Sequence, residues 1–279
     1  MKLAKIESVY RPNLLVNGDF QINQRGQTSY TSTDVQSSLT VDCWRIGGQA
    51  TLTVNDDNVI LSATGDGESY LAQHIDKDLT GKKLSVAVKV TNDKVYTGTI
   101  TVTDVETVFI SDGQWMTVSA KYDSNRKGTQ IYIKVRGGHS YSLEYADAFE
   151  GSIAYPHVEE DDAIALMRCQ DYVYGLIISD YARLPLGHLS SDMIQVSLPF
   201  INLKSNPSVI MNGDFDVRCA YPNWWNISYR GSITGASFDY KSKMFQFAKP
   251  SLSGAPDSGQ VYSIESQPGA RIILTCEPL

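Results

Sequence analysis

The sequence has 279 residues, a length that corresponds to one or two domains, and 42% of them are hydrophobic. A formal net charge of −7 and a pI of about 5.1 argue against nucleic-acid binding, because that affinity comes from Lys and Arg side chains that neutralise phosphates. Glycan recognition stays open, because it depends on hydrogen bonds and aromatic stacking rather than on net charge.

No stretch of the sequence approaches the roughly 18 apolar residues that a bilayer crossing requires, so membrane insertion is not expected. Residues 1–8 lack the apolar run of a secretory signal, and we therefore expect synthesis and folding in a cytoplasm. The cysteines form neither a C-x-x-C pair nor a metal-ligand spacing, which predicts free thiols, no metal site and no cofactor. They are Cys43, Cys169, Cys219 and Cys276.

Residues 1–11 form a polar segment with basic side chains at Lys2, Lys5 and Arg11, and the segment ends at Pro12. One interpretation is an N-terminal arm that docks on a neighbouring protein of an assembled particle. The other is a frayed terminus. The residue pattern does not separate these two interpretations.

The chain from residue 12 to residue 160 is a succession of short candidate strands. In residues 84–90, apolar Leu and Val alternate with small or polar residues, which is the period of a half-buried strand. Further alternating segments occupy residues 99–103, 115–119 and 130–135, and turn residues separate them. Short alternating runs at this spacing predict a β-sandwich or barrel and argue against a doubly wound α/β fold.

Residues 161–172 interrupt this rhythm. Two acids, Asp161 and Asp162, precede an apolar run that fits one or two helical turns, and acids suit the positive end of a helix. We predict a short linking helix here. Residues 173–279 are predicted to form a smaller, C-terminal β domain, a sandwich or barrel, so the whole chain is assigned to the all-β class.

Candidate strands of the C-terminal domain occupy residues 193–198, 207–211 and 271–275. Asn212 and Gly213 follow the second of these segments. Because both residue types tolerate positive φ, they predict a type I′ hairpin turn into residues 214–217.

The first part of the chain carries an ordered series of short sequence blocks. It opens with Asn-Leu-Leu-Val-Asn-Gly-Asp-Phe at residues 13–20, Gln-Arg-Gly at 24–26 and Asp-Cys-Trp at 42–44. The later blocks lie at residues 70–75, 79–86, 113–115, 149–156 and, as Cys-Gln-Asp-Tyr, 169–172. Across residues 12 to about 175, the series resembles a jelly-roll domain of bacteriophage tail appendage and receptor-binding proteins.

This resemblance implies an N-terminal jelly-roll β-sandwich related to carbohydrate-binding modules, placed in a phage tail or tail fibre. It also implies a homo-oligomer, most often a trimer, which contacts other tail or baseplate proteins through the arm of residues 1–11. In related sugar-binding sandwiches, an acidic residue after the Asn-Gly-x-Phe element helps to hold calcium. Gln21 stands at that place in this chain, which argues against calcium there.

The sequence contains no arrangement of residues that predicts catalysis. Hydrolysis of a polysaccharide needs two carboxylates about 5–10 Å apart. Asp214 and Asp216 share one face of a predicted strand, but a solvated hairpin face is the simpler interpretation. The histidines are isolated, and neither a nucleophile elbow nor a phosphate-binding glycine loop occurs. We therefore predict no catalytic residues and no enzyme.

The strongest candidate for ligand binding is an aromatic segment in the C-terminal domain. Sugar rings stack on aromatic side chains, while Asn and Arg hydrogen-bond the hydroxyls. An oligomer interface is the rival interpretation, because Trp, Tyr and Arg also dominate protein–protein hot spots, and the domain core is the third. Trp44 and Trp115, by contrast, are expected in the core of the sandwich. The candidate ligand-binding residues are Tyr221, Asn223, Trp224, Trp225, Tyr229 and Arg230.

The leading hypothesis is a structural protein of the virion tail that attaches to a host cell-surface glycan, a polysaccharide or teichoic acid, without cleaving it. Several copies acting together gain from effective concentration even where each subunit binds weakly. A head or neck fibre without a receptor role is the second hypothesis. The third is a depolymerase of surface polysaccharide, which predicts release of soluble sugar.

Overall fold

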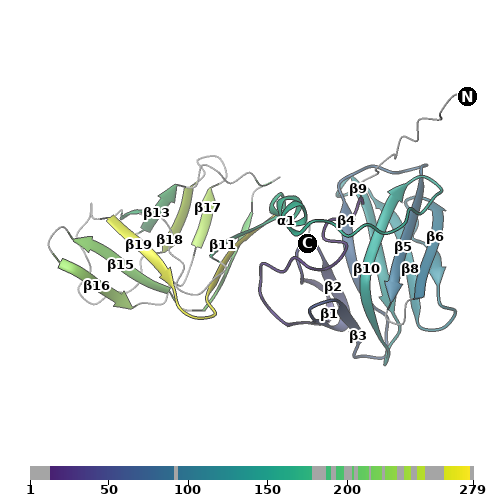
Figure 1. The fold of residues 1–279 in the computed structure, drawn as a ribbon, viewed down its shortest axis with the longest axis horizontal. Coiled ribbons are helices and arrows are strands. Elements are labelled where there is room, and N and C mark those ends of the chain that lie inside the picture. Colours follow the sequence, from purple (N-terminus) through teal and green to yellow (C-terminus); the bar gives the residue numbers. More distant parts are fainter. Residues whose placement is uncertain are drawn as a thin grey trace, which may run out of the picture. The chain divides into compact units, whose positions relative to one another are not determined.

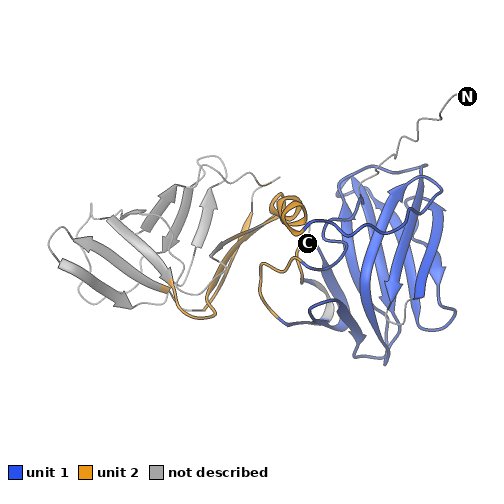
Figure 2. Cartoon of the chain, viewed as in Figure 1, with its two compact units in different colours: residues 1–21, 28–40, 44–161 blue, residues 22–27, 41–43, 162–279 orange. Residues whose placement is uncertain are grey.

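The computed structural model describes part of the chain, and after residue 177 it describes mainly the backbone pairing of strands. The described residues are 13–90, 94–177, 187–189, 193–197, 203, 207–213, 215–221, 224–230, 236–239, 244–248 and 261–276. The chain divides into two compact units (Figure 2). The first comprises residues 1–21, 28–40 and 44–161, and the second comprises residues 22–27, 41–43 and 162–279.

The first unit is a nearly closed, barrel-like antiparallel sheet (Figure 1), so the chain is mostly β, as predicted. Its strand order is β6-β5-β10-β3-β2-β4-β9-β8-β7, β1 pairs with β2 beside this path, and the end strands β6 and β7 contact each other. The strands are β1 (Ser29–Leu39), β2 (Arg45–Val54), β3 (Val59–Ala63), β4 (Ser69–Ile75), β5 (Lys83–Val90), β6 (Lys94–Thr101), β7 (Thr107–Ser111), β8 (Met116–Asp123), β9 (Gly128–Val135) and β10 (Ser140–Glu150).

Alternating side chains build the core of this unit. In β9, Ile131, Ile133 and Val135 are fully buried and point inward, whereas the residues between them belong to the outer face. Strand β4 follows the same rule, with fully buried Leu71 among its inward residues. The predicted core position of Trp44 is confirmed, because its side chain is fully buried.

The predicted core position of Trp115 is wrong, because this side chain is 37% exposed. The strand begins one residue later, at Met116. Met116 and Val118 take the inward positions of β8 and are fully buried. Trp115 has the opposite parity, so it belongs to the outer side at the end of the strand.

The predicted strand segments of the first unit agree with the structure apart from their ends. Residues 84–90 lie within β5 and residues 130–135 within β9. Residues 99–103 are only partly in a strand, because β6 ends at Thr101.

The exit segment, residues 151–160, covers the outer face of β10. The rings of Phe149 and Tyr155 meet edge to face, with centroids 5.3 Å apart, and the Tyr145 ring stacks on His157 at 3.8 Å. These contacts explain why β10 is buried on both faces over its second half, where even Asp147 is only 3% exposed.

In the second unit, the predicted linking helix is confirmed as α1 (Asp162–Gln170), which buries Ala165 and Cys169. A three-stranded sheet has the order β11-β20-β14, and a seven-stranded sheet has the order β16-β15-β19-β12-β13-β18-β17. Their strands are β11 (Val173–Ile177), β12 (Gly187–Leu189), β13 (Met193–Ser197), β14 (Ser208–Asn212), β15 (Phe215–Tyr221), β16 (Trp224–Arg230), β17 (Ala236–Asp239), β18 (Met244–Ala248), β19 (Val261–Ser266) and β20 (Arg271–Thr275).

The predicted hairpin at Asn212 and Gly213 is wrong. Strands β14 and β15 do flank these residues, but β14 pairs with β20, whereas β15 pairs with β16 and β19. Gly213 has φ +85°, but Asn212 lacks the positive φ that a type I′ turn also requires. The chain at this point crosses from one sheet to the other.

Two smaller expectations can be compared with the described residues. Cys43, Cys169 and Cys276 are free thiols, as predicted, and the side chain of Cys219 lies outside the described residues. The described residues also include no helix with the length and apolar character needed to cross a membrane.

Candidate functional site

The opening segment, residues 13–20, lies along the half of β10 that β3 leaves open. Strand β3 pairs only with residues 140–143 of β10, while β5 pairs with the opposite edge. Beyond β3, the Leu14 N–H donates to the Ala148 carbonyl at 2.8 Å, and the Ala146 N–H donates to the Gly18 carbonyl at 2.9 Å. The segment thus satisfies backbone groups of β10 that would otherwise form a free sheet edge.

Asn13 fixes the start of this segment with its side-chain amide. The Nδ2 group donates to the Ala146 carbonyl at 3.1 Å and to Asp147 Oδ1 at 2.8 Å. The Oδ1 atom accepts hydrogen bonds from the N–H groups of Leu15 at 3.0 Å and Ala148 at 2.8 Å. Both donor hydrogens and both acceptor lone pairs are therefore used, which only an amide side chain can do at this position.

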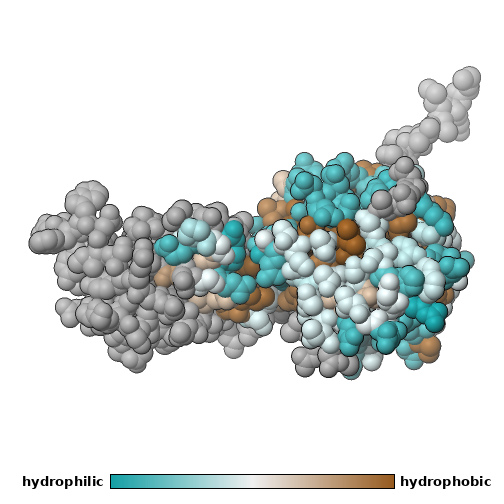
Figure 3. Space-filling view, turned by 90° about the horizontal axis from the view of Figure 1, so that it is seen from below, coloured by the Kyte–Doolittle hydropathy of each residue, from teal (hydrophilic) through white to brown (hydrophobic). Residues whose placement is uncertain are grey.

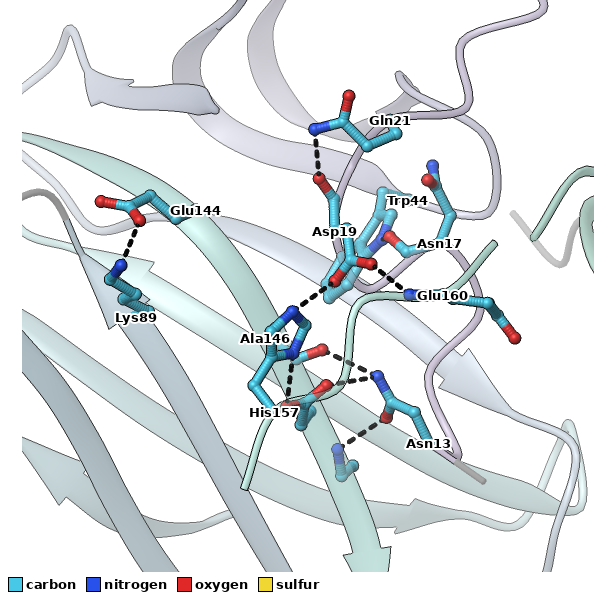
Figure 4. Close-up of polar contacts among 12 residues, drawn as sticks. Asn13, Asn17, Asp19, Gln21, Trp44, Lys89, Glu144, Ala146, His157 and Glu160 are labelled. Carbon is cyan, nitrogen blue, oxygen red and sulfur yellow. Dashed lines mark hydrogen bonds and ion pairs between the residues drawn. The ribbon is translucent and has the colours of Figure 1, made fainter. Parts of the chain in front are cut away.

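His157 joins the two ends of the first unit (Figure 4). Its Nδ1 atom lies 2.9 Å from Asp147 Oδ2, and its Nε2 atom lies 3.3 Å from Asp19 Oδ1. The other carboxylate oxygen of Asp19 accepts the Glu160 N–H at 3.2 Å. We call Asn13, Asp19, Asp147 and His157 the His157 clasp, because they tie the opening segment and the exit segment to β10.

The two carboxylates of the clasp favour the protonated form of His157. Burial lowers the pKa of His157, but the hydrogen bond and charge of Asp147, aided by Asp19, outweigh burial and leave this pKa above its ordinary value. Burial raises the pKa of Asp19, against the lowering effect of the Glu160 N–H and of His157. A protonated imidazole can donate to both carboxylates at once, whereas a neutral imidazole can donate to only one.

The rest of the opening block has structural partners. The Trp44 indole N–H donates to the Asn17 carbonyl at 2.8 Å, and the Phe20 ring packs against Trp44 with centroids 5.1 Å apart. Gln73 bonds both backbone groups of Val16, each at 2.7 Å. These contacts explain why Asn-Gly-Asp-Phe and Asp-Cys-Trp occur together in one chain.

A second polar cluster, the Gln24–Asp42 node, lies inside the second unit. Gln24 Nε2 donates to Asp42 Oδ2 at 2.5 Å and to the Val173 carbonyl at 3.0 Å, while Gln24 Oε1 accepts the Gly175 N–H at 2.8 Å. Arg25 Nη1 lies 3.4 Å from Asp42 Oδ1. The node therefore connects the Gln-Arg-Gly and Asp-Cys-Trp blocks with β11, directly after the Cys-Gln-Asp-Tyr block.

The outer face of β2, β4, β9 and β8 carries a third group of polar and aromatic side chains. Tyr70 and Tyr132 come from paired strands, and their rings meet edge to face at 5.4 Å. Small residues flank Tyr132 in the sheet, because Ala72 and Ser119 are its cross-strand neighbours. We call this surface the Tyr132 face. Its residues are Arg45, Tyr70, His74, Lys121, Gln130, Tyr132 and Lys134.

Cations and a fixed hydroxyl define the Tyr132 face. The Nζ atoms of Lys121 and Lys134 lie 5.7 Å and 5.5 Å from the centre of the Tyr132 ring. Burial raises the pKa of Tyr132 to about 12, so its hydroxyl stays protonated and donates to Gln130 Oε1 at 2.6 Å. The face combines an aromatic surface, positive charge and directional hydrogen-bonding groups.

His74 and Gln130 of this face each have a buried polar atom without a hydrogen-bond partner among the described residues. Burial lowers the pKa of His74, which keeps the ring neutral, and Nε2 lies 3.4 Å from Asp76 Oδ1. With the proton on Nε2, Nδ1 is an acceptor without a donor. Gln130 Nε2, on the neighbouring strand, is a donor without an acceptor. Both side chains are almost completely buried, so these two atoms belong to the interior of the face and are not contacts for a ligand on its surface.

The predicted ligand-binding segment lies on two strands whose side chains are outside the described residues. Tyr221 ends β15, and Trp224, Trp225, Tyr229 and Arg230 belong to β16, which pairs with it. Asn223 falls outside the described residues altogether, as does Asp214. The ligand role of this segment stays a prediction.

Sequence reasoning did not identify the Tyr132 face, although it identified its strands. Tyr70 and His74 alternate with inward residues in β4, as Gln130 and Tyr132 do in β9. That alternation showed which side chains share a face of one strand. It did not show that β4 and β9, far apart in the chain, are neighbours.

No protein-family model matches the chain, and a search of curated proteins also gives no match.

Proposed function

We propose that this chain is a structural protein of a bacteriophage tail that attaches to a host cell-surface glycan by non-covalent recognition. The tail assignment is supported by the ordered series of sequence blocks from residue 12 to about 175. The glycan assignment is supported by the Tyr132 face. No bond cleavage is part of the proposal.

The Tyr132 face is the single observation that carries glycan recognition. Sugars present apolar C–H groups that pack on aromatic rings, together with hydroxyls that require donors and acceptors. The face offers two tyrosine rings, the ammonium group of Lys121 and the Tyr132 hydroxyl, while Lys134 pairs with Glu106 beside them.

We further assign the first unit to the jelly-roll class of β-sandwiches. Support comes from the consecutive hairpin strands β7, β8 and β9 with β4 beside β9, which is a Greek-key arrangement. The second unit is proposed to be a smaller β-sandwich or barrel. Its segment from Tyr221 to Arg230 is a second candidate glycan contact.

In the particle, we propose a homo-oligomer, a trimer by resemblance, that joins other tail or baseplate proteins through residues 1–11. Repetition of the site in an oligomer raises the overall affinity for a repetitive surface polymer without new contacts. Antibody labelling of intact virions tests the location. Labelling of the head or neck instead of the tail favours a decoration protein.

The glycan proposal is tested with the full chain on immobilised bacterial cell walls and on a glycan array. We expect Tyr132→Ala to weaken binding by about tenfold or more, because it removes the central aromatic surface. Tyr96→Ala is the matched control, because Tyr96 also lies under a lysine, with Lys94 Nζ at 4.4 Å from its ring, but on β6. Equal loss by both variants contradicts the site, and release of soluble sugar contradicts recognition without cleavage.

A further inference from the structure

Trp115 lies among three loops of the first unit, residues 64–68, 112–115 and 136–139, which contact one another. The Trp115 carbonyl accepts the Arg136 N–H at 2.9 Å, which joins the loop before β8 to the loop between β9 and β10. The second of these loops bonds the end of β3, because the Ala63 N–H donates to the His139 carbonyl at 2.9 Å and the Gly138 N–H to the Ala63 carbonyl at 3.1 Å. Backbone hydrogen bonds thus hold the surroundings of Trp115 in place.

The side chain of Asp112 fixes the backbone of the loop that carries Trp115. Its Oδ1 atom accepts the N–H groups of Gln114, Trp115 and Met116 at 2.8, 2.7 and 3.0 Å. Burial raises the pKa of Asp112, but these backbone bonds outweigh burial and leave this pKa below its ordinary value. The Tyr141 hydroxyl donates to the other carboxylate oxygen. Asp112 is therefore ionised, and both of its carboxylate oxygens already accept hydrogen bonds from the surrounding loops and from Tyr141.

Close packing of the neighbouring loops adds rigidity. A Cβ atom at Gly137 would lie 2.5 Å from the Gly65 carbonyl oxygen and from the Asp66 carbonyl carbon, so only glycine fits this approach. The aromatic group above these loops is consequently preorganised, which lowers the entropic cost of binding through it.

Trp115, His139 and Arg136 form what we call the Trp115 platform. The imidazole of His139 stacks on the Trp115 indole, with ring centres 3.7 Å apart and planes 18° apart. The guanidinium carbon of Arg136 lies 5.9 Å from the centre of the indole. Although His139 covers one side of the indole, Trp115 remains 37% exposed.

The surroundings of the platform fit a saccharide better than a protein. Among the described residues, Trp115 is the only large exposed hydrophobic side chain on the loops of residues 64–68, 112–115 and 136–139. The core of a protein–protein interface needs a broader apolar area. Figure 3, in which the platform is not labelled, shows one face of the molecule, where apolar residues form separate patches among hydrophilic ones. A sugar ring needs only one aromatic surface with polar groups around it.

Arg136 indicates the charge of the ligand. Its side chain is exposed and makes no ion pair with any carboxylate that the structure describes, and its guanidinium group lies beside the Trp115 ring. A guanidinium group binds carboxylate and phosphate groups through paired hydrogen bonds. The nearby carboxylate of Asp112 does not compete, because the loop backbone and Tyr141 already bind it.

We infer that the Trp115 platform is a second binding site of the first unit, for a saccharide that carries an anionic group. This inference rests on the proposed function and extends it by naming the ligand class and a site at the loop end of the unit. The sugar ring packs on the indole, and the carboxylate or phosphate group pairs with Arg136.

The test is a titration of the full chain against an array with three arms: uronic-acid oligosaccharides, glycerol-phosphate oligomers and neutral glucans. We expect binding to at least one acidic arm, about tenfold weaker for Trp115→Ala and about fivefold weaker for Arg136→Gln. Trp115→Phe keeps an aromatic ring and is expected to fall between wild type and Trp115→Ala. Preference for the uronic-acid or the phosphate arm identifies the source of the anionic group.

Lys127→Gln is the matched control for Arg136→Gln. Both residues are exposed cations that flank β9, Lys127 before its first residue and Arg136 after its last, so they lie at opposite ends of one strand. The control is expected to bind like wild type. Equal weakening by both substitutions would show a general charge effect and overturn the assignment to the platform.

The other outcomes also decide the question. Unchanged binding by folded Trp115→Ala, together with weakened binding by Tyr132→Ala, overturns the platform and leaves the proposed function in place. Binding of neutral glucans alone overturns the ligand class. A changed oligomeric state of Trp115→Ala with unchanged glycan binding replaces the inference with a protein interface. Absence of binding by the wild-type chain on every arm contradicts both proposals.

Discussion

The His157 clasp and the Gln24–Asp42 node both connect segments that are distant in the sequence. The clasp does so through a histidine between two carboxylates, and the node does so through one carboxylate with an amide and a guanidinium group. The clasp lies in the first unit, where His157 is partly exposed and stands between two carboxylates. The node lies in the second unit, where the Asp42 side chain is fully buried and is bonded by an amide and a guanidinium group. The stability that the partly exposed clasp contributes therefore depends on pH, because His157 titrates. The stability that the buried node contributes depends mainly on whether all of its members are present.

The largest effect is expected at the node, for Asp42→Ala. This change leaves Arg25, whose side chain is 6% exposed, without the carboxylate beside it and removes two acceptors from Gln24. Breaking a buried pair by removing one partner costs about 3–5 kcal/mol. Urea denaturation measures the loss, and amide hydrogen exchange at Gly175, which donates to Gln24, locates it.

Asp42→Asn is the matched control for this prediction, because it keeps the shape and one acceptor oxygen. We expect it to fall between Asp42→Ala and wild type. A cost below 1 kcal/mol for Asp42→Ala would contradict the idea that the node holds the second unit together.

A smaller effect is expected at the clasp, for Asn13→Asp. The substitution keeps the size of the side chain but replaces its donor with a carboxylate oxygen, which then faces Asp147 and the Ala146 carbonyl. Loss of two donated hydrogen bonds, with repulsion added, is expected to destabilise the first unit by about 2–3 kcal/mol at neutral pH. The cost is expected to shrink at low pH, where a protonated carboxyl can donate again. A cost independent of pH argues against repulsion as its cause.

The smallest effect, and the most specific, is the pH dependence of the clasp. The pKa of His157 is raised in the folded state, so its stabilising contribution is complete below the unfolded value of about 6.5 and is lost as pH rises through the folded pKa. The raised pKa of Asp19 acts in the same direction at lower pH, because the folded state then binds protons more strongly than the unfolded chain. The contribution of the clasp to the stability of the first unit is therefore expected to decrease from mildly acidic to mildly alkaline pH, while the lowered pKa of His74 acts in the opposite direction below about pH 6.5 in wild type and variant alike.

The measurement is the urea midpoint of wild type and His157→Gln between pH 5 and 9. We expect His157→Gln to cost about 1 kcal/mol at the acidic end and to flatten the pH profile. Lys89→Gln is the control, because Lys89 Nζ pairs with Glu144 of β10 at 2.7 Å on the surface (Figure 4). This substitution is expected to leave the slope of the pH profile unchanged. A profile with an unchanged slope in His157→Gln would show that another group titrates.

Local patterns predicted much of the fold. Alternation identified β5 and β9, and the acids before an apolar run identified α1, because both signals depend on neighbouring residues. The errors have a common cause. Asn-Gly next to a strand was interpreted as a hairpin, but the long-range pairing of β14 with β20 determined where the chain turned. Trp115 was expected in the core because it lies in one of the sandwich blocks, but it precedes β8 and has the opposite parity to the inward Met116.

The candidate sites depended more strongly on tertiary structure. His157 was one of four isolated histidines in the sequence, and only the return of residues 151–160 over β10 placed it between Asp19 and Asp147. Tyr70 and Tyr132 belong to strands separated by β5 through β8 along the chain. No local pattern contains the register that brings their rings together.

The sequence by itself determined the mostly β composition of the chain, the short helix and the inward or outward side of residues along individual strands. These properties follow from the period of two in strands and from the helix dipole, which act over a few residues. Tertiary structure alone decided which strands are neighbours, and hence the clasp, the Tyr132 face and the Trp115 platform. Each of these clusters is joined by contacts between residues distant in the chain, which local sequence patterns do not encode.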